Sequence, residues 1–374
     1  AQAWQIPPPL AATEACSGPP GKAFPGGGAC PLARAVATCP PTAGGPAMPE
    51  FRTLHTGEAA IRVALEGTGP LILMVHGFPE SWYSWRHQIS PIAEAGFTAA
   101  AMDVRGYGGS TRFPEVSDYR MEALIADILG VGAVLSPDAP FILIGHDWGA
   151  PQVWNTALLH PGRIAAVAAL SVPFYGAPEF SFDDVIKRVF DDRDRFFYQS
   201  YFRTPGRAEA DLEADLRNFL AGFYYSISGD AKDGDWKLGL PSAARLMETL
   251  TVPAALPAWM SPADLDYYES EFRRSGLFGP ISRYRNHTRD FEFLAPFRER
   301  KITQPACFIA GDKDPAFNGF GMVTDPIAKM RPAVPGLESA TVLAGCGHWT
   351  QQERPSEVNA ALLPWLTSLK GRVV

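Results

Sequence analysis

Short, almost wholly apolar runs separated by helix-like segments most constrain the fold of this chain. The runs that we expect to form strands lie at 61–65, 71–75, 98–102, 141–144 and 164–170. Runs without polar residues are typical of strands covered on both faces, as in parallel sheets. Apolar residues at helical spacing lie between them, at 85–94, 121–135 and 148–159. This order predicts the α/β class, a parallel sheet with helices on both faces.

The alternation stops between about residues 174 and 295, where aromatic, charged and helix-forming residues show no strand pattern. It returns at 306–310, 340–343 and a closing helix, 356–369. We therefore expect a helical lid domain, 174–295, inserted into a core domain made of residues 49–173 and 296–374.

Residues 1–48 differ in composition, with ten prolines, seven glycines and only three charged side chains. Such a segment buries too little apolar surface to offset the entropy of ordering it, so we expect a flexible N-terminal extension. Two alternatives stay open. Met48 is the natural start, or the segment is an ordered arm anchored by Trp4 and Phe24.

Composition narrows the function classes. A net charge of −7 argues against a nucleic-acid partner, and no apolar run approaches the roughly 18 residues that span a bilayer. The five cysteines form no CxxC pair, and clustered Cys/His ligands for a metal are missing from the sequence. The first residues lack a signal-peptide pattern. We expect a cytoplasmic protein, with export left open because the chain starts at Ala1.

The sharpest local signal is Gly145-His-Asp147-Trp-Gly149, which follows an apolar run and precedes a helical segment. A strand, a small-x-acid-x-small turn and a helix form a nucleophile elbow, in which glycines allow close backbone contact. A carboxylate is ionised at pH 7 and can attack an electrophilic carbon, leaving an ester for water to hydrolyse. The alternative is that Asp147 only caps the following helix.

An ester intermediate needs a base. His348, on the Gly-flanked turn 345–349, is the expected base, because imidazole titrates near neutral pH. Its orienting acid should follow the strand at 306–310, where Asp314 is the first choice and Asp312 the reserve. The chain order nucleophile, acid, histidine matches the α/β-hydrolase arrangement.

An oxyanion hole is expected from backbone N–H groups of Phe78 and Trp148, after the strand at 71–75 and the nucleophile respectively. Phe78, Pro79 and Trp148 are also the expected substrate contacts. Cys346 is rejected as the nucleophile, because Asp147 is better placed.

With these motifs in order, the sequence resembles epoxide hydrolases of the α/β-hydrolase fold over residues 50–370. The resemblance rests on the motifs at 76–82, 103–110, 145–149 and 345–349. It implies two lid tyrosines that hold the epoxide oxygen, placed at Tyr198 and Tyr284, with Tyr201 a competitor for the first. Phenols stay protonated at pH 7 and can donate a proton to the opening ring.

The resemblance implies an enzyme that converts epoxides to vicinal diols through an ester on Asp147, hydrolysed by water that His348 activates. No metal or organic cofactor is implied. The expected partners are a small apolar epoxide and water, with no nucleic acid and no membrane, for a monomer or homodimer. The alternatives are a haloalkane dehalogenase, which also uses an Asp nucleophile, and a non-catalytic ligand receptor on the same fold.

Overall fold

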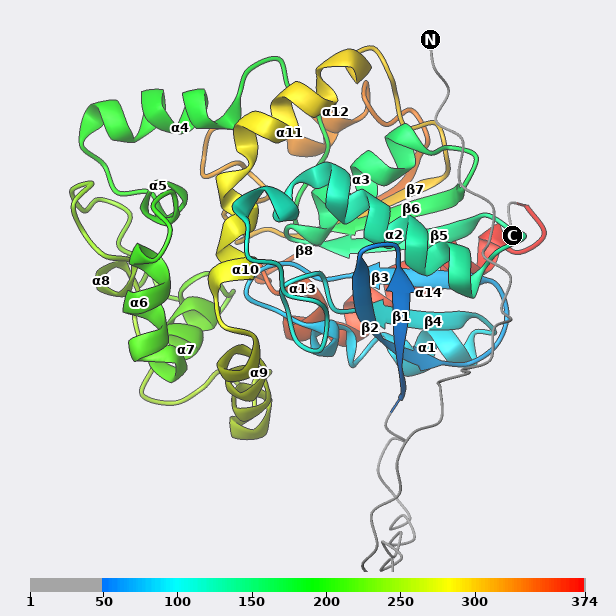
Figure 1. The fold of residues 1–374 in the computed structure, drawn as a ribbon, viewed down its shortest axis with the longest axis horizontal. Coiled ribbons are helices and arrows are strands. Elements are labelled where there is room, and N and C mark those ends of the chain that lie inside the picture. Colours follow the sequence, from blue (N-terminus) through cyan, green and yellow to red (C-terminus); the bar gives the residue numbers. More distant parts are fainter. Residues whose placement is uncertain (1–48, 373–374) are drawn as a thin grey trace, which may run out of the picture. The chain divides into compact units, whose positions relative to one another are not determined.

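The structure, a computed structural model, describes residues 49–372 and is built on an eight-stranded sheet. The strand order is β1-β2-β4-β3-β5-β6-β7-β8 (Figure 1). The pairs β1–β2 and β2–β4 are antiparallel, and every later pair is parallel. This confirms the α/β class and the mostly parallel sheet. The expected extension, 1–48, and residues 373–374 lie outside the described residues.

The strands are β1 (Glu50–Thr56), β2 (Ala59–Glu66), β3 (Leu71–Val75), β4 (Thr98–Met102), β5 (Phe141–His146), β6 (Ile164–Leu170), β7 (Ala306–Gly311) and β8 (Leu337–Leu343). The helices outside the insertion are α1 (Ile89–Glu94), α2 (Met121–Leu135), α3 (Gly149–Leu159), α12 (Pro326–Met330), α13 (Thr350–Glu353) and α14 (Pro355–Leu369), with 3₁₀ turns η1 (Trp82–Trp85) and η2 (Val116–Tyr119).

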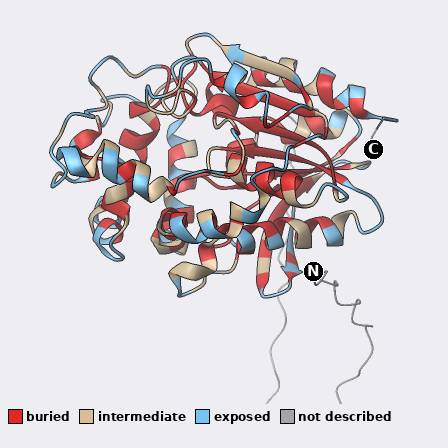
Figure 2. Ribbon diagram, turned by 90° about the horizontal axis from the view of Figure 1, so that it is seen from above, coloured by how far each residue is buried: buried red, intermediate tan, exposed pale blue. Residues whose placement is uncertain are grey.

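Side chains of the central strands enter two separate apolar clusters, one on each face of the sheet. Along β3, Leu71, Leu73 and Val75 pack with residues of α2 and α3. Ile72 and Met74 pack on the other face with residues of α1 and α14. Alternate side chains of a strand point to opposite faces, so a strand covered twice must be apolar throughout. Figure 2 shows these strands as a buried centre.

The chain between β6 and β7 is helical. Its elements are α4 (Phe182–Val189), η3 (Asp191–Arg193), α5 (Tyr198–Phe202), α6 (Arg207–Ala214), α7 (Leu216–Ser226), α8 (Leu246–Thr249), α9 (Pro262–Ser275), α10 (Phe278–Ser282), η4 (Arg283–Arg285), α11 (His287–Leu294) and η5 (Ala295–Phe297). Figure 1 shows α4–α9 to the left of the sheet. An inserted helical block was expected here.

Two local expectations need correction. Strand β1 was not expected, because it is an edge strand with five exposed residues and no apolar run. The helix expected at 85–94 is instead the 3₁₀ turn η1 followed by α1. Pro91 accounts for the break, since a proline ring clashes with the carbonyl four residues earlier and fits a helix best in its first turn.

The carboxyl ends of β3, β5, β6, β7 and β8 lie along one edge of the sheet, because these strands run parallel. The loops that follow β3, β5, β7 and β8 carry Phe78, Asp147, Asp314 and His348. The loop after β6 leads into the helical insertion. The sheet topology therefore brings the expected site residues to one edge.

Candidate active site

Asp147 sits at a strained turn between β5 and α3. Its φ is +48°, a region that non-glycine residues adopt rarely. A Cβ at Gly149 would collide with the Val75 carbonyl, and one at Gly145 with the Gly149 carbonyl, so both positions need glycine. Helix α3 starts at Gly149 with Trp148 at its N-cap, so Asp147 lies one residue before the cap. The turn has the geometry of an elbow, as expected.

His348 lies between two carboxylates. Its Nε2 is 3.3 Å from Asp147 Oδ2, and its Nδ1 is 2.9 Å from Asp314 Oδ1. Asp312, the reserve, points elsewhere, because its Oδ1 accepts from the Gly345 N–H at 2.8 Å. Asp314 is fully buried, whereas the Asp147 side chain keeps 14% of its surface exposed. The geometry favours Asp314 as the partner of His348 and leaves Asp147 accessible.

The charges of this group reinforce one another. Burial alone would lower the pKa of His348, but Asp314 and Asp147 outweigh it and raise that pKa well above its usual value. Burial would raise the pKa of Asp147, yet the hydrogen bond and charge of His348 bring it below its usual value. Both pKa shifts favour the charged forms, a carboxylate on Asp147 and an imidazolium on His348.

One expected oxyanion donor is hydrogen-bonded to Asp147. The Phe78 N–H donates to Asp147 Oδ1 at 2.8 Å. A Cβ at Gly77 would collide with the Asp147 carboxyl group, so glycine is what lets this loop approach. Trp148, the second expected donor, begins the turn into α3 with φ −63°.

The two expected tyrosines lie together, although they come from separate segments. The rings of Tyr198 and Tyr284 meet edge to face, with centroids 5.7 Å apart. Burial, followed by the Asp147 charge, raises the pKa of Tyr198; burial and then Tyr198 raise that of Tyr284. Tyr201, the competitor, instead donates its hydroxyl to Asp211 at 2.6 Å. Both phenols of the pair therefore favour the neutral form, and both line a cavity together with Asp147.

Two cavities meet at Asp147. The larger has a volume of about 320 Å³, and Trp148, Tyr198 and Asp147 line part of it. The smaller has about 30 Å³, and Phe78, Tyr284 and His348 line part of it. Of the expected substrate contacts, Phe78 and Trp148 therefore face a cavity. Pro79, the third expected substrate contact, lines neither of these two cavities, and its carbonyl accepts from the Tyr224 hydroxyl at 2.7 Å.

Sequence reasoning missed two buried carboxylates that hold the site loops. Glu80 Oε2 accepts from the Gly77 N–H and lies 2.8 Å from His146 Nδ1, while His146 Nε2 lies 2.7 Å from the His348 carbonyl. Glu353 accepts from the N–H groups of Gly347 and Trp349, at 2.8 and 3.0 Å. The signal for Glu80 and His146 was present, since both stand inside the motifs at 76–82 and 145–149.

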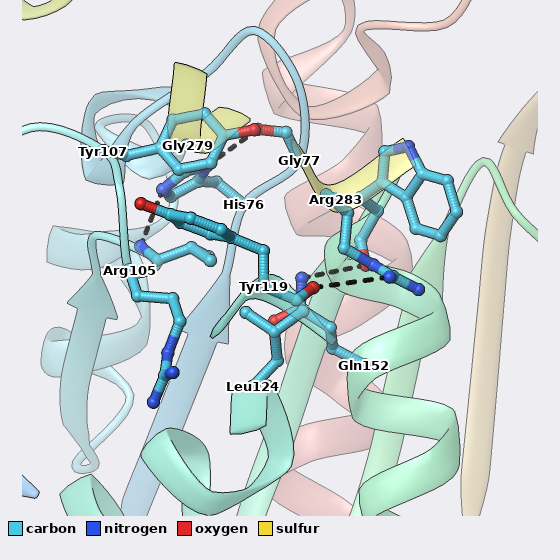
Figure 3. Close-up of a pocket in the computed structure, with 11 residues that line it drawn as sticks. His76, Gly77, Arg105, Tyr107, Tyr119, Leu124, Gln152, Gly279 and Arg283 are labelled. Atoms are coloured by element: carbon cyan, nitrogen blue, oxygen red, sulfur yellow. Dashed lines mark hydrogen bonds between the residues drawn. The ribbon is translucent and has the colours of Figure 1, made fainter. Parts of the chain in front are cut away.

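A further small cavity lies beside the loop that carries Phe78 (Figure 3). His76, Tyr107 and Tyr119 line part of it, and its volume is about 10 Å³. His76 Nε2 accepts from the Val104 N–H at 3.0 Å, and its Nδ1 donates to the Gly77 carbonyl. A space of this size holds at most one water-sized group. The hydrogen bonds of His76 hold the loop in place, and the cavity is too small to admit an organic substrate.

None of the helices in residues 49–372 combines the length and apolarity needed to cross a membrane. In the same residues, no group of three or more His, Cys, Asp or Glu side chains is arranged so that it could hold a metal ion.

A mostly parallel sheet with a strand–turn–helix elbow, whose exposed residue faces a histidine–carboxylate pair, is the arrangement of the α/β-hydrolase class. A family model described as the alpha/beta hydrolase fold matches residues 70–355. Epoxide hydrolase A of Mycobacterium tuberculosis is 39% identical over 330 residues, covering 87% of this chain and 99% of that protein. Epoxide hydrolase B of the same organism is 37% identical over 335 residues, covering 81% and 92%.

Solved structures of epoxide hydrolases are also similar to this chain. An epoxide hydrolase from an endophytic Streptomyces is 45% identical, with a TM-score of 0.81, covering 86% of this chain and 96% of that one. Epoxide Hydrolase A from Mycobacterium thermoresistibile is 38% identical, with a TM-score of 0.79, covering 85% and 98%. The chain therefore belongs to the α/β-hydrolase fold family and, within it, to the epoxide hydrolases. This confirms the family and the function expected from the sequence; the enzyme acts on a small-molecule substrate and water.

Proposed function

We propose that this enzyme opens epoxides by covalent catalysis on Asp147 and hydrolyses the ester with water activated by His348. The observation that carries the proposal is the placement of an ionised Asp147, within 3.3 Å of His348, where the cavity beside Tyr198 meets the one lined by Tyr284. The residue roles follow from that arrangement.

In the first step, a carboxylate oxygen of Asp147 attacks an epoxide carbon and the carbon–oxygen bond of the ring breaks. Because the Phe78 N–H already holds Oδ1, we assign the attack to Oδ2. Tyr198 and Tyr284 hold the epoxide oxygen and supply the proton that it takes up as it leaves carbon. Their raised pKa values keep both phenols protonated at neutral pH.

In the second step, formation of the ester itself prepares the base. Ionised Asp147 is one of the two carboxylates that raise the pKa of His348. An ester carries no charge, so alkylation lowers the pKa of His348 and lets it release its proton, which replaces the proton that the tyrosine pair gave to the leaving oxygen. Neutral His348, oriented by Asp314, then deprotonates the water that attacks the ester carbonyl. The Phe78 and Trp148 N–H groups hold the oxyanion. When this intermediate collapses, the bond between the acyl carbon and the substrate oxygen breaks, that oxygen takes the proton from His348, and a vicinal diol leaves with the Asp147 carboxylate restored.

The larger cavity supports an apolar epoxide, including one that bears an aryl group. Besides Trp148, its walls include Phe182, Phe291 and Leu294. We assign residues 174–295 as the lid domain over a core of 49–173 and 296–374, because Tyr198 and Tyr284 come from the insertion while Asp147 and His348 come from loops of the sheet. The cytoplasmic location expected from the sequence stays a prediction.

Two product assays on the purified enzyme test this proposal. Styrene oxide should be converted to its vicinal diol, and a panel of chloro- and bromoalkanes should release no halide above the uncatalysed rate. Halide release without diol formation would favour the dehalogenase alternative. Stoichiometric binding with no turnover of either class would favour a receptor.

A further inference from the structure

The small cavity beside His348 and the large cavity beside Trp148 share only part of their lining. Four residues line both of them: Asp147, Tyr198, Ala316 and Phe320. In the proposed function Asp147 attacks the epoxide and Tyr198 holds its oxygen, so the epoxide lies where the two cavities meet. Phe320 is the one bulky apolar side chain of the four, and it comes from the loop between β7 and α12.

The backbone of this loop is set in an unusual way. Phe320 has φ +58°, and its neighbours Gly319 and Gly321 also have positive φ, at 56° and 83°. A bulky side chain in this region is an outlier, which surrounding contacts must hold in place. The Phe320 N–H donates to the Pro315 carbonyl at 2.7 Å, and the Gly321 N–H to Asn318 Oδ1 at 2.9 Å. These bonds fix the loop that presents the ring.

Aromatic side chains of the insertion enclose the Phe320 ring. The ring lies edge to face with Phe197 at 5.3 Å and with Trp236 at 6.0 Å, measured between centroids, and 6.4 Å from Tyr198. Trp236 also lines the small cavity. The ring therefore joins a loop of the sheet to the helical insertion at the point where the two cavities meet.

The two volumes differ by more than one aryl group. A cavity that accommodates benzene measures about 150 Å³, and one water-sized probe needs about 10–15 Å³. The large cavity, at about 320 Å³, has room for an aryl group and more. The small cavity, at about 30 Å³, has room for about two water-sized groups, and His348 lines it. The water that His348 activates needs part of that space.

We propose that Phe320 is a specificity-determining residue that closes the small cavity, so that the enzyme accepts epoxides with one bulky apolar substituent and only hydrogen or methyl on the other carbon. This rests on the proposed function and names the substrate class of the same site. The bulky substituent occupies the cavity beside Trp148, and the hydrolytic water and the small substituent share the cavity beside His348.

Three probes test the proposal by kcat/KM: styrene oxide, trans-β-methylstyrene oxide and trans-stilbene oxide, which carry hydrogen, methyl and phenyl on the second carbon. For the wild type, kcat/KM for styrene oxide and kcat/KM for trans-β-methylstyrene oxide should lie within about 10-fold of each other. The value for trans-stilbene oxide should be lower than that for styrene oxide by at least about 100-fold. Phe320→Ala should reduce the ratio of kcat/KM for styrene oxide to kcat/KM for trans-stilbene oxide by at least about 10-fold. Trp236→Ala, which enlarges the same cavity from the side of the insertion, should also reduce this ratio.

Phe51→Ala is the matched control, because Phe51 is 42% exposed on the edge strand β1 and should leave the ratio unchanged. Wild-type enzyme that turns over trans-stilbene oxide as well as styrene oxide would overturn the proposal, whether or not the variants fold. So would an unchanged ratio in a folded Phe320→Ala or Trp236→Ala variant. Failure to turn over any of the three epoxides would count against the proposed function instead.

Discussion

The Nε2 atom of His348 lies 3.3 Å from Oδ2 of Asp147, so the proposed base directly faces the carboxylate whose ester we propose that it hydrolyses. In the proposed mechanism, this contact couples the two chemical steps. While Asp147 is ionised, its charge helps to keep His348 protonated, and its conversion to an ester removes that charge. In this mechanism, His348 can therefore act as a base only after Asp147 has been alkylated.

Replacing His348 separates the two steps. His348→Gln removes the base but leaves Asp147 and both tyrosines, so the ester should form and then persist. Turnover should fall by about 10²–10⁴-fold, the range typical of lost general base catalysis. Intact-protein mass spectrometry after incubation with styrene oxide should show a single added substrate mass, and a variant that loses turnover without any adduct would contradict the assignment.

The pKa of His348 should respond to the charge on Asp147. Asp147→Asn removes a negative charge that helps to raise that pKa, so the pKa should move down. The imidazole of the variant should therefore deprotonate at lower pH than that of the wild type. NMR titration of the histidine ring nitrogens measures the difference. An equal or higher pKa in the variant would show that Asp147 does not control the base.

The tyrosine pair should act in alkylation. Tyr198→Phe and Tyr284→Phe each remove a donor to the leaving oxygen, so each should slow adduct formation by about 10–100-fold in single-turnover experiments. Tyr201→Phe is the matched control, because the Tyr201 hydroxyl donates to Asp211. It should leave the alkylation rate within about twofold of wild type. A larger loss in Tyr201→Phe than in Tyr198→Phe would exchange their roles.

Substitutions of Asp314 and Asp312 should have very different effects on kcat. Asp314→Asn leaves His348 Nδ1 without its charged partner at 2.9 Å, and we expect a loss of at least about 100-fold in kcat. Asp312→Asn changes only an acceptor for the Gly345 N–H, so kcat should stay within about threefold. Steady-state rates of both variants, with thermal unfolding to check that each is folded, decide between them. Equal losses would return Asp312 to consideration.

Apolar runs were enough to locate the buried strands, because a strand covered on both faces leaves a continuous signal in the sequence. Strands β3, β4 and β6 have the expected bounds. Strand β1 left no such signal, since most of its residues face solvent. Pro91 was a sequence signal for the break before α1, but the apolar residues at helical spacing favoured one continuous helix.

The candidate site followed from motifs that parallel strands bring to one edge, so chain order and strand ends sufficed to propose Asp147 and His348 and to narrow the acid to Asp314 or Asp312. Placing Tyr198 and Tyr284 needed the family resemblance, because the helical insertion gives no comparable rule. Contacts such as Glu80 with His146 join segments 66 residues apart and depend on three-dimensional packing. The same holds for Phe320, whose role rests on a cavity that no sequence pattern describes.

Oxygen tracing in a single turnover tests the covalent role of Asp147 most directly. With enzyme in excess over styrene oxide in ¹⁸O water, the new oxygen of the first diol should come from the Asp147 carboxylate and carry no label. The ¹⁸O should instead appear in the peptide that contains Asp147. A labelled first-turnover diol with an unlabelled peptide would mean that water attacks the epoxide directly, and it would contradict the mechanism.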